Sequence, residues 1–499
     1  MSDSNSFFGH PRGLATLFFT EMWERFSYYG MRALLILFMV AAVEEGGMGL
    51  DEKMAGSIYG LYTMFVYLLA LPGGWLADRF FGLRNSIYYG GILITIGHFC
   101  LAFPMPQTFF LGLAFIVIGT GLLKPNISGM VGELYPADEP ARRDAGFSIF
   151  YMGINIGAFI SPLITSYLGE SIEWHYGFAV AGIGMLIGVI QYKLTEGYLG
   201  EVGKEPSRLA DPQQQALREA RIRYGLWAFG LLFALLVILL FTGTVTIDPV
   251  VIAQVSTYVI AGAAVAYFLY IFLFENLESE EKKKIGVIAI IFLISCFFYA
   301  GYEQQGSSLN LFAERYTDRM LGDWEMPAGW FQSVPAVMVI IFSPIFAWLF
   351  IWLSKRNLDP NSPIKVALGV VFMGLGYLVM VGASLIVVAG NAASPSWLVM
   401  TYLMHTFGEI LLYPVSLSAV TKLAPKRLVG QLMGLFFMSL ALGNLVAGLF
   451  AGEFDADAIT ADPEIQVDLF FTVAKAMIIP AAVVLIFSKQ IKKLMGNIR

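Results

Sequence analysis

The sequence predicts an all-α polytopic membrane protein, with two six-helix bundles, an inserted helical pair and both chain ends in the cytoplasm. Three observations support this class. Of the 499 residues, 57% are hydrophobic and 14% are charged, whereas soluble domains carry about 25% charged residues. The apolar residues form about fourteen runs long enough to cross a bilayer, and the mean hydropathy is +0.70. Lysine and arginine gather in alternate loops between these runs.

The spans follow from hydropathy alone. A membrane helix needs about 20 mainly apolar residues, and membrane helices tolerate glycine and proline. With that window the expected spans lie near 13–43, 55–78, 85–104, 107–134, 145–168, 176–195, 224–243, 249–274, 285–314, 328–354, 363–390, 396–421, 429–452 and 467–489.

Two polar segments divide the spans into groups of six, two and six. The two middle spans carry no charge away from their edges, whereas the outer groups do. Two six-helix halves are a design of transporters. The expected division is an N-terminal bundle at 1–200, a linker at 201–223, an inserted pair at 224–274, a linker at 275–284 and a C-terminal bundle at 285–499.

The loops set the orientation, because cytoplasmic loops are enriched in lysine and arginine. One set of loops holds Arg79, Arg84, Lys204 and most other basic residues, whereas loops 169–175 and 453–466 hold none. Both termini are therefore expected in the cytoplasm, in a multi-pass protein of the cytoplasmic (inner) membrane.

Charged side chains inside the first span indicate function, because such residues are rare in membranes. At about 100° per residue, Glu21, Glu24, Arg25, Tyr28 and Arg32 share one helix face. A single polar stripe suits a water-filled cavity between helices. A second interpretation is an ion-pair network that only stabilises the bundle, although buried pairs contribute weakly to stability.

The other spans hold three isolated charges of interest. Lys124 needs a partner when buried, and a glutamate of the first span is the obvious one, unless this lysine only joins two helices. Glu303 and Glu409 are lone acids in apolar surroundings, so each is a candidate proton carrier or a partner of a basic group. His405, one turn before Glu409, is expected to be a packing residue.

The signs of these charges suggest a substrate. The basic residues within the spans, Arg25, Arg32 and Lys124, lie in the first half, and the second half offers Glu303 and Glu409. This distribution suits a zwitterion with separated charges, such as a short peptide.

Other function classes lack support in the sequence. Neither a basic patch for nucleic acid nor a nucleotide motif is present, since "GTGLLKP" does not satisfy GxxxxGK[ST]. The two cysteines and four histidines suggest no metal site, and the spans hold no nucleophile–base set for an enzyme.

Several motifs resemble one family. The segment "EMWERFSYYG" (21–30) looks like the ExxERFxYYG motif of the proton-dependent oligopeptide transporters, within the major facilitator superfamily. Three further segments, 147–162, 73–84 and 408–437, resemble that family's FYxxINxG signature, the general facilitator motif, and the family's span 10–11 region. The extra central pair is similar to that of bacterial members.

The resemblance implies a proton-coupled symporter that imports di- and tripeptides by alternating access, with the proton as coupling ion and no cofactor. Peptide-like drugs are further expected substrates, and the oligomeric state is left open. The implied roles are proton coupling for Glu21, Glu24, Arg25, Lys124 and Glu303; an extracellular gate of Arg32 and Glu303; peptide binding by Arg25, Tyr29, Tyr62, Lys124, Tyr151, Asn155, Tyr299 and Glu409; and a cytoplasmic motif of Asp78, Arg79 and Arg84.

Four positions depart from the family pattern. Thr63 stands where animal members carry a histidine, and Pro335 with the next alanine replaces an Asn-Pro pair. Tyr299 replaces a frequent tryptophan and Tyr413 a small residue, which leaves the choice between dipeptides and tripeptides open.

The alternatives to this function are a transporter of another solute, such as nitrate, a glycoside or a drug, and, with much less support, a membrane-embedded enzyme.

Overall fold

The computed structural model describes residues 6–136 and 138–495, and most of these are helical. Contacts divide the chain into two compact units, which we call unit 1 and unit 2. Unit 1 comprises Met1–Met31 and Phe65–Asp248, and unit 2 comprises Arg32–Met64 and Pro249–Arg499. Two helices, α1 (Gly13–Val40) and α2 (Glu52–Leu68), contribute residues to both units. Each unit is described by itself.

Unit 1 also contains a short hairpin, further α-helices, one π-helical turn and one 3-10 turn. Its elements are β1 (Ser6–Phe7), β2 (His10–Pro11), α3 (Ala70–Leu76), the π-helical turn η2 (Ala77–Phe81), α4 (Leu83–Leu101), α5 (Pro106–Glu133), α6 (Pro140–Ser171), α7 (Trp174–Thr195), the 3-10 turn η3 (Glu196–Leu199) and α8 (Pro212–Phe241).

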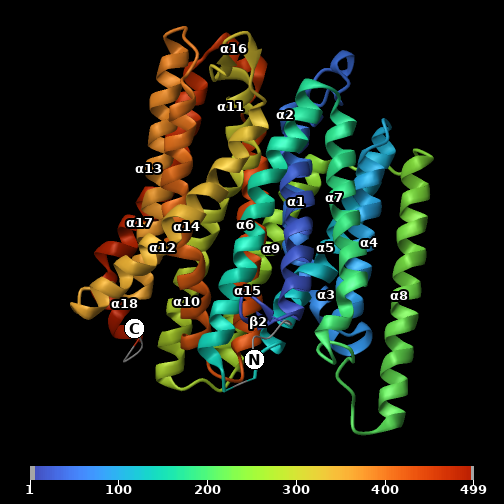
Figure 1. The fold of residues 1–499 in the computed structure, drawn as a ribbon. Helices are drawn as coiled ribbons and strands as arrows, with labels where there is room; N and C mark the ends of the chain where they lie inside the picture. The colour runs from blue at the N-terminus through green and yellow to red at the C-terminus, as the bar shows by residue number, and fades with distance from the viewer. Residues whose placement is uncertain (1–5, 137, 496–499) are drawn as a thin grey trace. The chain divides into compact units, whose positions relative to one another are not determined.

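Within unit 1, α4 packs along both α5 and α7, and the three run side by side in Figure 1. Gly90 of α4 permits this approach, since a Cβ there would lie 2.6 Å from the carbonyl oxygen of Gly119 in α5. Small residues let membrane helices pack closely. A buried core that includes Leu17, Leu123 and Met185 joins α1, α5 and α7.

Unit 2 holds the remaining elements. They are η1 (Val43–Glu45), α9 (Pro249–Phe274), α10 (Ser279–Tyr302), η4 (Glu303–Gly306), α11 (Ser308–Tyr316), β3 (Met320–Leu321), β4 (Trp324–Glu325), η5 (Ala328–Ser333), α12 (Val334–Lys355), α13 (Ser362–Val388), α14 (Pro395–Leu423), α15 (Val429–Ala451), α16 (Ala456–Ala461), α17 (Glu464–Ile486) and α18 (Ser488–Met495).

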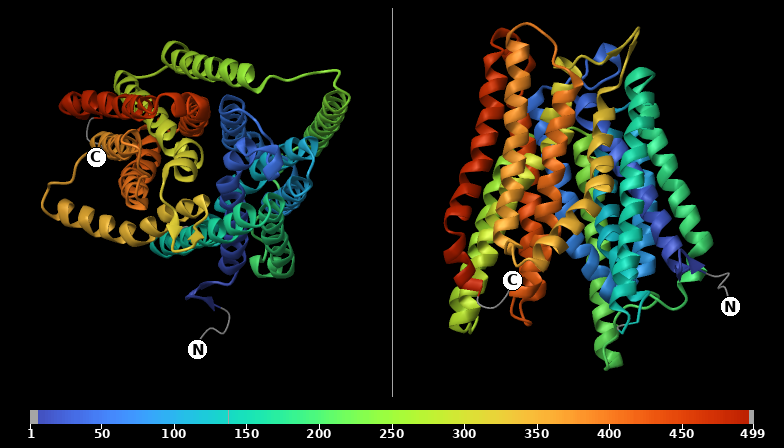
Figure 2. Two further views of the ribbon diagram at one scale, coloured as in Figure 1. Left: turned by 90° about the horizontal axis from the view of Figure 1, so that it is seen from above. Right: turned by 60° about the vertical axis from the view of Figure 1, so that its left-hand side comes forward.

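Within unit 2, α13 packs against both α14 and α17, the orange and red helices that lie together in Figures 1 and 2. Helix α10 packs on α15 and α13, and α9 packs on α15. The start of α13 has a clear cause, because Asn361 caps it by accepting a hydrogen bond from the Ile364 amide at 3.2 Å.

The prediction of a polytopic all-α protein is confirmed. Among the described residues, twelve helical segments are long and apolar enough to cross a membrane. Helices α1 and α4 are also long, with 28 and 19 residues, which brings the long segments to the fourteen expected. Helix α1 misses the criterion because every 18-residue window holds at least three charges. The orientation of the termini stays a prediction.

The predicted spans at 55–78 and 285–314 are present within the helical segments Glu52–Phe81 and Ser279–Tyr316, and each segment contains a break in its α-helix. The span at 55–78 is divided between α2 and α3 at Leu69 and ends in the π-helical turn η2. Pro72 follows the break, and proline lacks the amide that a continuous helix needs. The span at 285–314 breaks at η4, beside Glu303, where α10 gives way to α11.

Two helices begin inside the predicted linkers at 201–223 and 275–284. Helix α8 begins at Pro212, because Asp211 caps it by accepting from the Gln213 amide at 2.8 Å and proline suits the first helical turn. Helix α10 begins at Ser279, behind a capping box formed by Glu278 and Glu281. The wider division into bundles and an inserted pair stays a prediction.

Candidate functional site

The first charged cluster lies on α1 in unit 1. Arg25 Nε is 2.9 Å from Glu21 Oε1 and 2.6 Å from Glu24 Oε2, and all three side chains are buried. The first contact is a hydrogen bond, and the second is an ion pair outside hydrogen-bond geometry. Since Nε carries a single N–H, the two carboxylates compete for it. Three residues of the predicted polar stripe, Glu21, Glu24 and Arg25, therefore form one compact cluster.

Lys124 of α5 lies near this cluster. Its Nζ is 4.1 Å from the ring centroid of Tyr67, a cation–π distance, and it interacts electrostatically with Glu24. The expected glutamate neighbour is thus present, whereas Tyr67 is a contact that the sequence analysis missed. Pro125 lies inside the same helix.

Tyr29, Tyr151 and Asn155 are the other predicted peptide-binding residues of unit 1. The ring of Tyr29 meets that of Tyr28 edge-on at 5.2 Å. Tyr151 is exposed, whereas Asn155 is buried and donates from its amide nitrogen to the Tyr151 carbonyl oxygen at 2.9 Å. The Asn155 amide is thus bonded within its own helix, α6.

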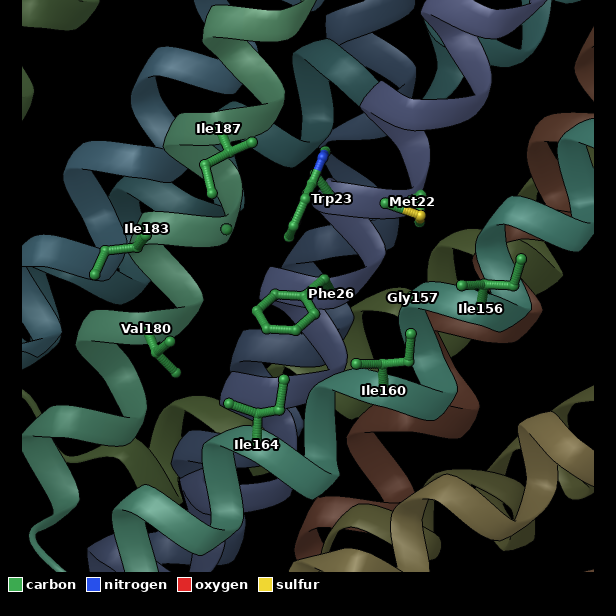
Figure 3. A pocket seen from close by; sticks show the side chains of 11 residues that line it. Met22, Trp23, Phe26, Ile156, Gly157, Ile160, Ile164, Val180, Ile183 and Ile187 are labelled. Atoms are coloured by element: carbon green, nitrogen blue, oxygen red, sulfur yellow. The ribbon is translucent and has the colours of Figure 1, made fainter.

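A second feature of unit 1 is an apolar cavity of about 270 Å³ between α1, α6 and α7. Figure 3 shows the side chains that surround it, and none is charged. It is lined by Met22, Trp23, Phe26, Ile156, Gly157, Ile160, Ile164, Val180, Ile183, Gly184 and Ile187. None of the predicted peptide-binding residues lines this cavity.

The second charged cluster lies in unit 2. Arg32 Nη2 is 3.5 Å from Glu303 Oε2, and both side chains are buried. Arg32 Nε also donates a hydrogen bond of 2.9 Å to the hydroxyl of Tyr59 in α2. The structure thus brings the predicted gate pair together and adds Tyr59, which the sequence analysis did not single out.

Glu409 of α14 is the other predicted acid of unit 2. It accepts a hydrogen bond of 3.0 Å from the Tyr302 hydroxyl. The sequence analysis did not single out Tyr302, although its position directly before Glu303 could have indicated it. Tyr299 and Tyr62, both buried, lie on α10 and α2. His405 is buried as expected, 3.4 Å from the Gln305 side-chain nitrogen.

The facilitator motif forms the turn between α3 and α4. The buried Arg84 donates to the carbonyl oxygens of Val202 at 2.7 Å and Gly200 at 2.5 Å. The Asp78 carbonyl oxygen accepts from both the amide and the hydroxyl of Ser207, each at 2.8 Å. The start of the predicted linker is therefore folded against the motif.

The remaining motif and departure positions have local contacts. The Arg79 guanidinium lies 5.3 Å from the Trp75 ring centroid. Thr63 donates to the Tyr59 carbonyl oxygen at 2.9 Å within α2, and Pro335 lies in the first turn of α12, where its missing amide costs no helical bond. Tyr413 lies on α14. Among the described residues, no group of three potential metal ligands occurs.

With this geometry in view, the chain was compared with known proteins. The model of the POT family matches residues 84–465. The chain belongs to the POT family. This is a family of membrane transporters, so the predictions of family and broad class are confirmed.

Relatives and solved structures agree with the family model. The chain is 43% identical to Peptide transporter YePEPT of Yersinia enterocolitica, over 99% of this chain and 96% of the relative. It is 35% identical to a Di-/tripeptide transporter of Lactococcus lactis subsp. cremoris, over 99% and 98%. A crystal structure of peptide transporter POT in complex with sulfate matches with a TM-score of 0.88 and 37% identity, over 99% and 97%.

Proposed function

We propose that this chain is a proton-coupled symporter that imports di- and tripeptides by alternating access across the cytoplasmic membrane. Membership of the POT family supports peptide transport. So do two relatives, named a peptide transporter and a di-/tripeptide transporter. A mutant of peptide transporter POT has been crystallised with alafosfalin, at 36% identity to this chain. A peptide-like drug is therefore a reasonable further substrate.

The buried cluster on α1 is the observation that supports proton coupling. Glu21 and Glu24 compete for one N–H of Arg25. Protonation of either acid removes one competitor, so Arg25 then pairs with the other acid or with a substrate carboxylate. A proton thereby changes the electrostatic environment of the cation that would bind substrate.

The residues of unit 1 receive three roles in this proposal. Glu21 and Glu24 couple the proton, and Lys124 acts as their cationic neighbour. Arg25, Lys124 and Tyr29 bind the peptide carboxylate, and Tyr151 and Asn155 contribute to peptide binding. Asp78, Arg79 and Arg84 act at the cytoplasmic side.

The residues of unit 2 receive the remaining roles. Arg32 and Glu303 form the extracellular gate, which opens when Glu303 is protonated and releases Arg32. Glu409 receives the peptide amino group, and Tyr62 and Tyr299 contribute to the pocket. The proton is the coupling ion, and no other cofactor is invoked.

The test is uptake of radiolabelled dialanine into proteoliposomes. We expect accumulation with an acidic outside and an alkaline lumen, and equilibration without a pH gradient. Dipeptide uptake that ignores the gradient would refute symport. Thermal unfolding gives a second measurement, because a bound dipeptide should raise the melting temperature. Stabilisation by nitrate or a glycoside, but not by a dipeptide, would favour a different substrate class.

A further inference from the structure

We propose that Tyr59 is the positioning residue of the Arg32–Glu303 pair, and that its hydroxyl keeps the Arg32 guanidinium from closing fully on the Glu303 carboxylate. This inference rests on the proposed function, in which that pair opens and closes the extracellular side. It assigns to α2 a direct part in proton-controlled gating.

The contact distances show which partner lies closer to the Arg32 guanidinium. Arg32 donates from Nε to the Tyr59 hydroxyl at 2.9 Å, a normal hydrogen bond, whereas its nearest contact with the Glu303 carboxylate is 3.5 Å. The latter is longer than a charge-assisted N–H···O bond of about 2.7–2.9 Å. The tyrosine, not the carboxylate, is therefore the tighter of the two contacts on the guanidinium.

The Tyr59 hydroxyl is fixed from two further sides. It donates to the Glu303 carbonyl oxygen at 3.4 Å, so one oxygen contacts both members of the pair. A Cβ on Gly306 would lie 2.2 Å from this hydroxyl and 2.6 Å from Arg32 Nε. The ring of Tyr59 is fully buried. Only a glycine leaves room for this arrangement at the helix break η4.

Charges around Arg32 explain what such positioning achieves. Two titratable groups of α14, Tyr402 and Glu409, also interact with Arg32, and Glu409 interacts with Glu303 as well. Buried ion pairs strengthen steeply as they shorten. A guanidinium held at 3.5 Å separates from the carboxylate more readily than one in a bidentate pair, so Tyr59 sets how acidic the outside must be to open the gate.

The experiment removes the hydroxyl alone with Tyr59→Phe. We expect the outside pH for half-maximal dialanine uptake to fall by about one unit, equivalent to tenfold in a protonation equilibrium. The matched control is Tyr377→Phe, because Tyr377 is buried and donates to the Gly301 carbonyl oxygen at 2.7 Å, beside the same helix break. It is not a contact of Arg32 or Glu303, so its pH profile should stay that of the wild type.

A second variant covers a loss of folding in the first. Gly306→Ala pushes against both the Tyr59 hydroxyl and Arg32 Nε, so we expect a changed pH profile, in either direction. An unchanged pH profile in both Tyr59→Phe and Gly306→Ala overturns the proposal. An equal shift in Tyr377→Phe overturns it as well, because the effect would then be structural.

A double-mutant cycle separates this inference from the proposed function. Tyr59→Phe and Arg32→Gln are combined, and melting temperatures of the purified variants are compared. Non-additive effects show the coupling and need no transport. Additive effects on the melting temperature refute the positioning contact even if dipeptide uptake is normal. Non-additive effects without any dipeptide uptake refute the proposed function alone.

Discussion

Glu24→Gln is the most direct test of proton coupling on α1. The cluster combines two acids, Glu21 and Glu24, with two basic residues, Arg25 and Lys124. The variant keeps the shape of Glu24 while it fixes position 24 in the uncharged form. We expect the variant to bind and exchange peptide but to lose gradient-driven accumulation, because no proton can be taken up or released at position 24.

The size of the effect follows from the ion pair. At 2.6 Å and an effective dielectric constant of about 20, the Coulomb term is about 6 kcal/mol, and desolvation offsets most of it. Close charge pairs couple by about 1.5–7 kcal/mol. Gradient-driven accumulation should therefore fall at least about tenfold, since each 1.4 kcal/mol corresponds to about tenfold.

The assay compares two fluxes in the same proteoliposomes. Uptake under an acid-outside gradient should fall. Counterflow, measured at equal pH on both sides of the membrane, should stay within about twofold of the wild type, because the variant loses only the proton-linked step. The control is Glu196→Gln, which removes a partly exposed acid paired with Lys193 at 2.7 Å. Normal accumulation by Glu24→Gln would refute the reasoning.

Three further predictions concern stability. Arg84→Ala removes two charged hydrogen bonds to loop carbonyls, so its free energy of unfolding should fall by about 2–4 kcal/mol, measured by thermal unfolding; an unchanged value would contradict the docked linker. Gly157→Ala should be destabilising, because its Cβ would lie 2.3 Å from the Met22 carbonyl oxygen, whereas Gly129→Ala, with nothing within 4 Å, should be neutral or stabilising. Burial and a nearby arginine lower the pKa of His10 below its usual 6.5. The stabilisation of the N-terminal hairpin by His10 is therefore present above pH 6.5 and is lost as the pH falls. Hydrogen exchange of the hairpin amides should show this loss, and His10→Gln should remove the pH dependence.

Hydropathy predicted the helices well because bilayer thickness fixes their length. Every expected span corresponds to a helical segment, and the helical spacing of Glu21 and Arg25 predicted their contact. What hydropathy does not encode is an interruption. Leu69 lies in an unbroken apolar run, and the chain around Glu303 changes from α-helix to a 3-10 turn without a proline.

The contacts missed by the sequence analysis share one cause. Tyr59, Tyr67 and Tyr302 are aromatic residues in apolar spans, where tyrosine is usual and its hydroxyl partner depends on packing of distant segments. Tyr59 and Glu303 are 244 residues apart, a separation that no local pattern reports. The contact of Arg84 with the linker was missed for a similar reason. Its partners are backbone carbonyls, which every residue has, so the residue types do not indicate it.

The helix break at η4 has a consequence for the energy of movement. Unpaired carbonyls in a bilayer cost several kcal/mol each, yet those around the break are held by side chains of other segments: Tyr377 on Gly301, Tyr59 on Glu303 and Gln332 on Gln305. These hydroxyl and amide donors sit on rotatable groups that can follow a shifted acceptor. A change of angle at the break would therefore not have to leave these carbonyls unpaired, because the donors can follow them.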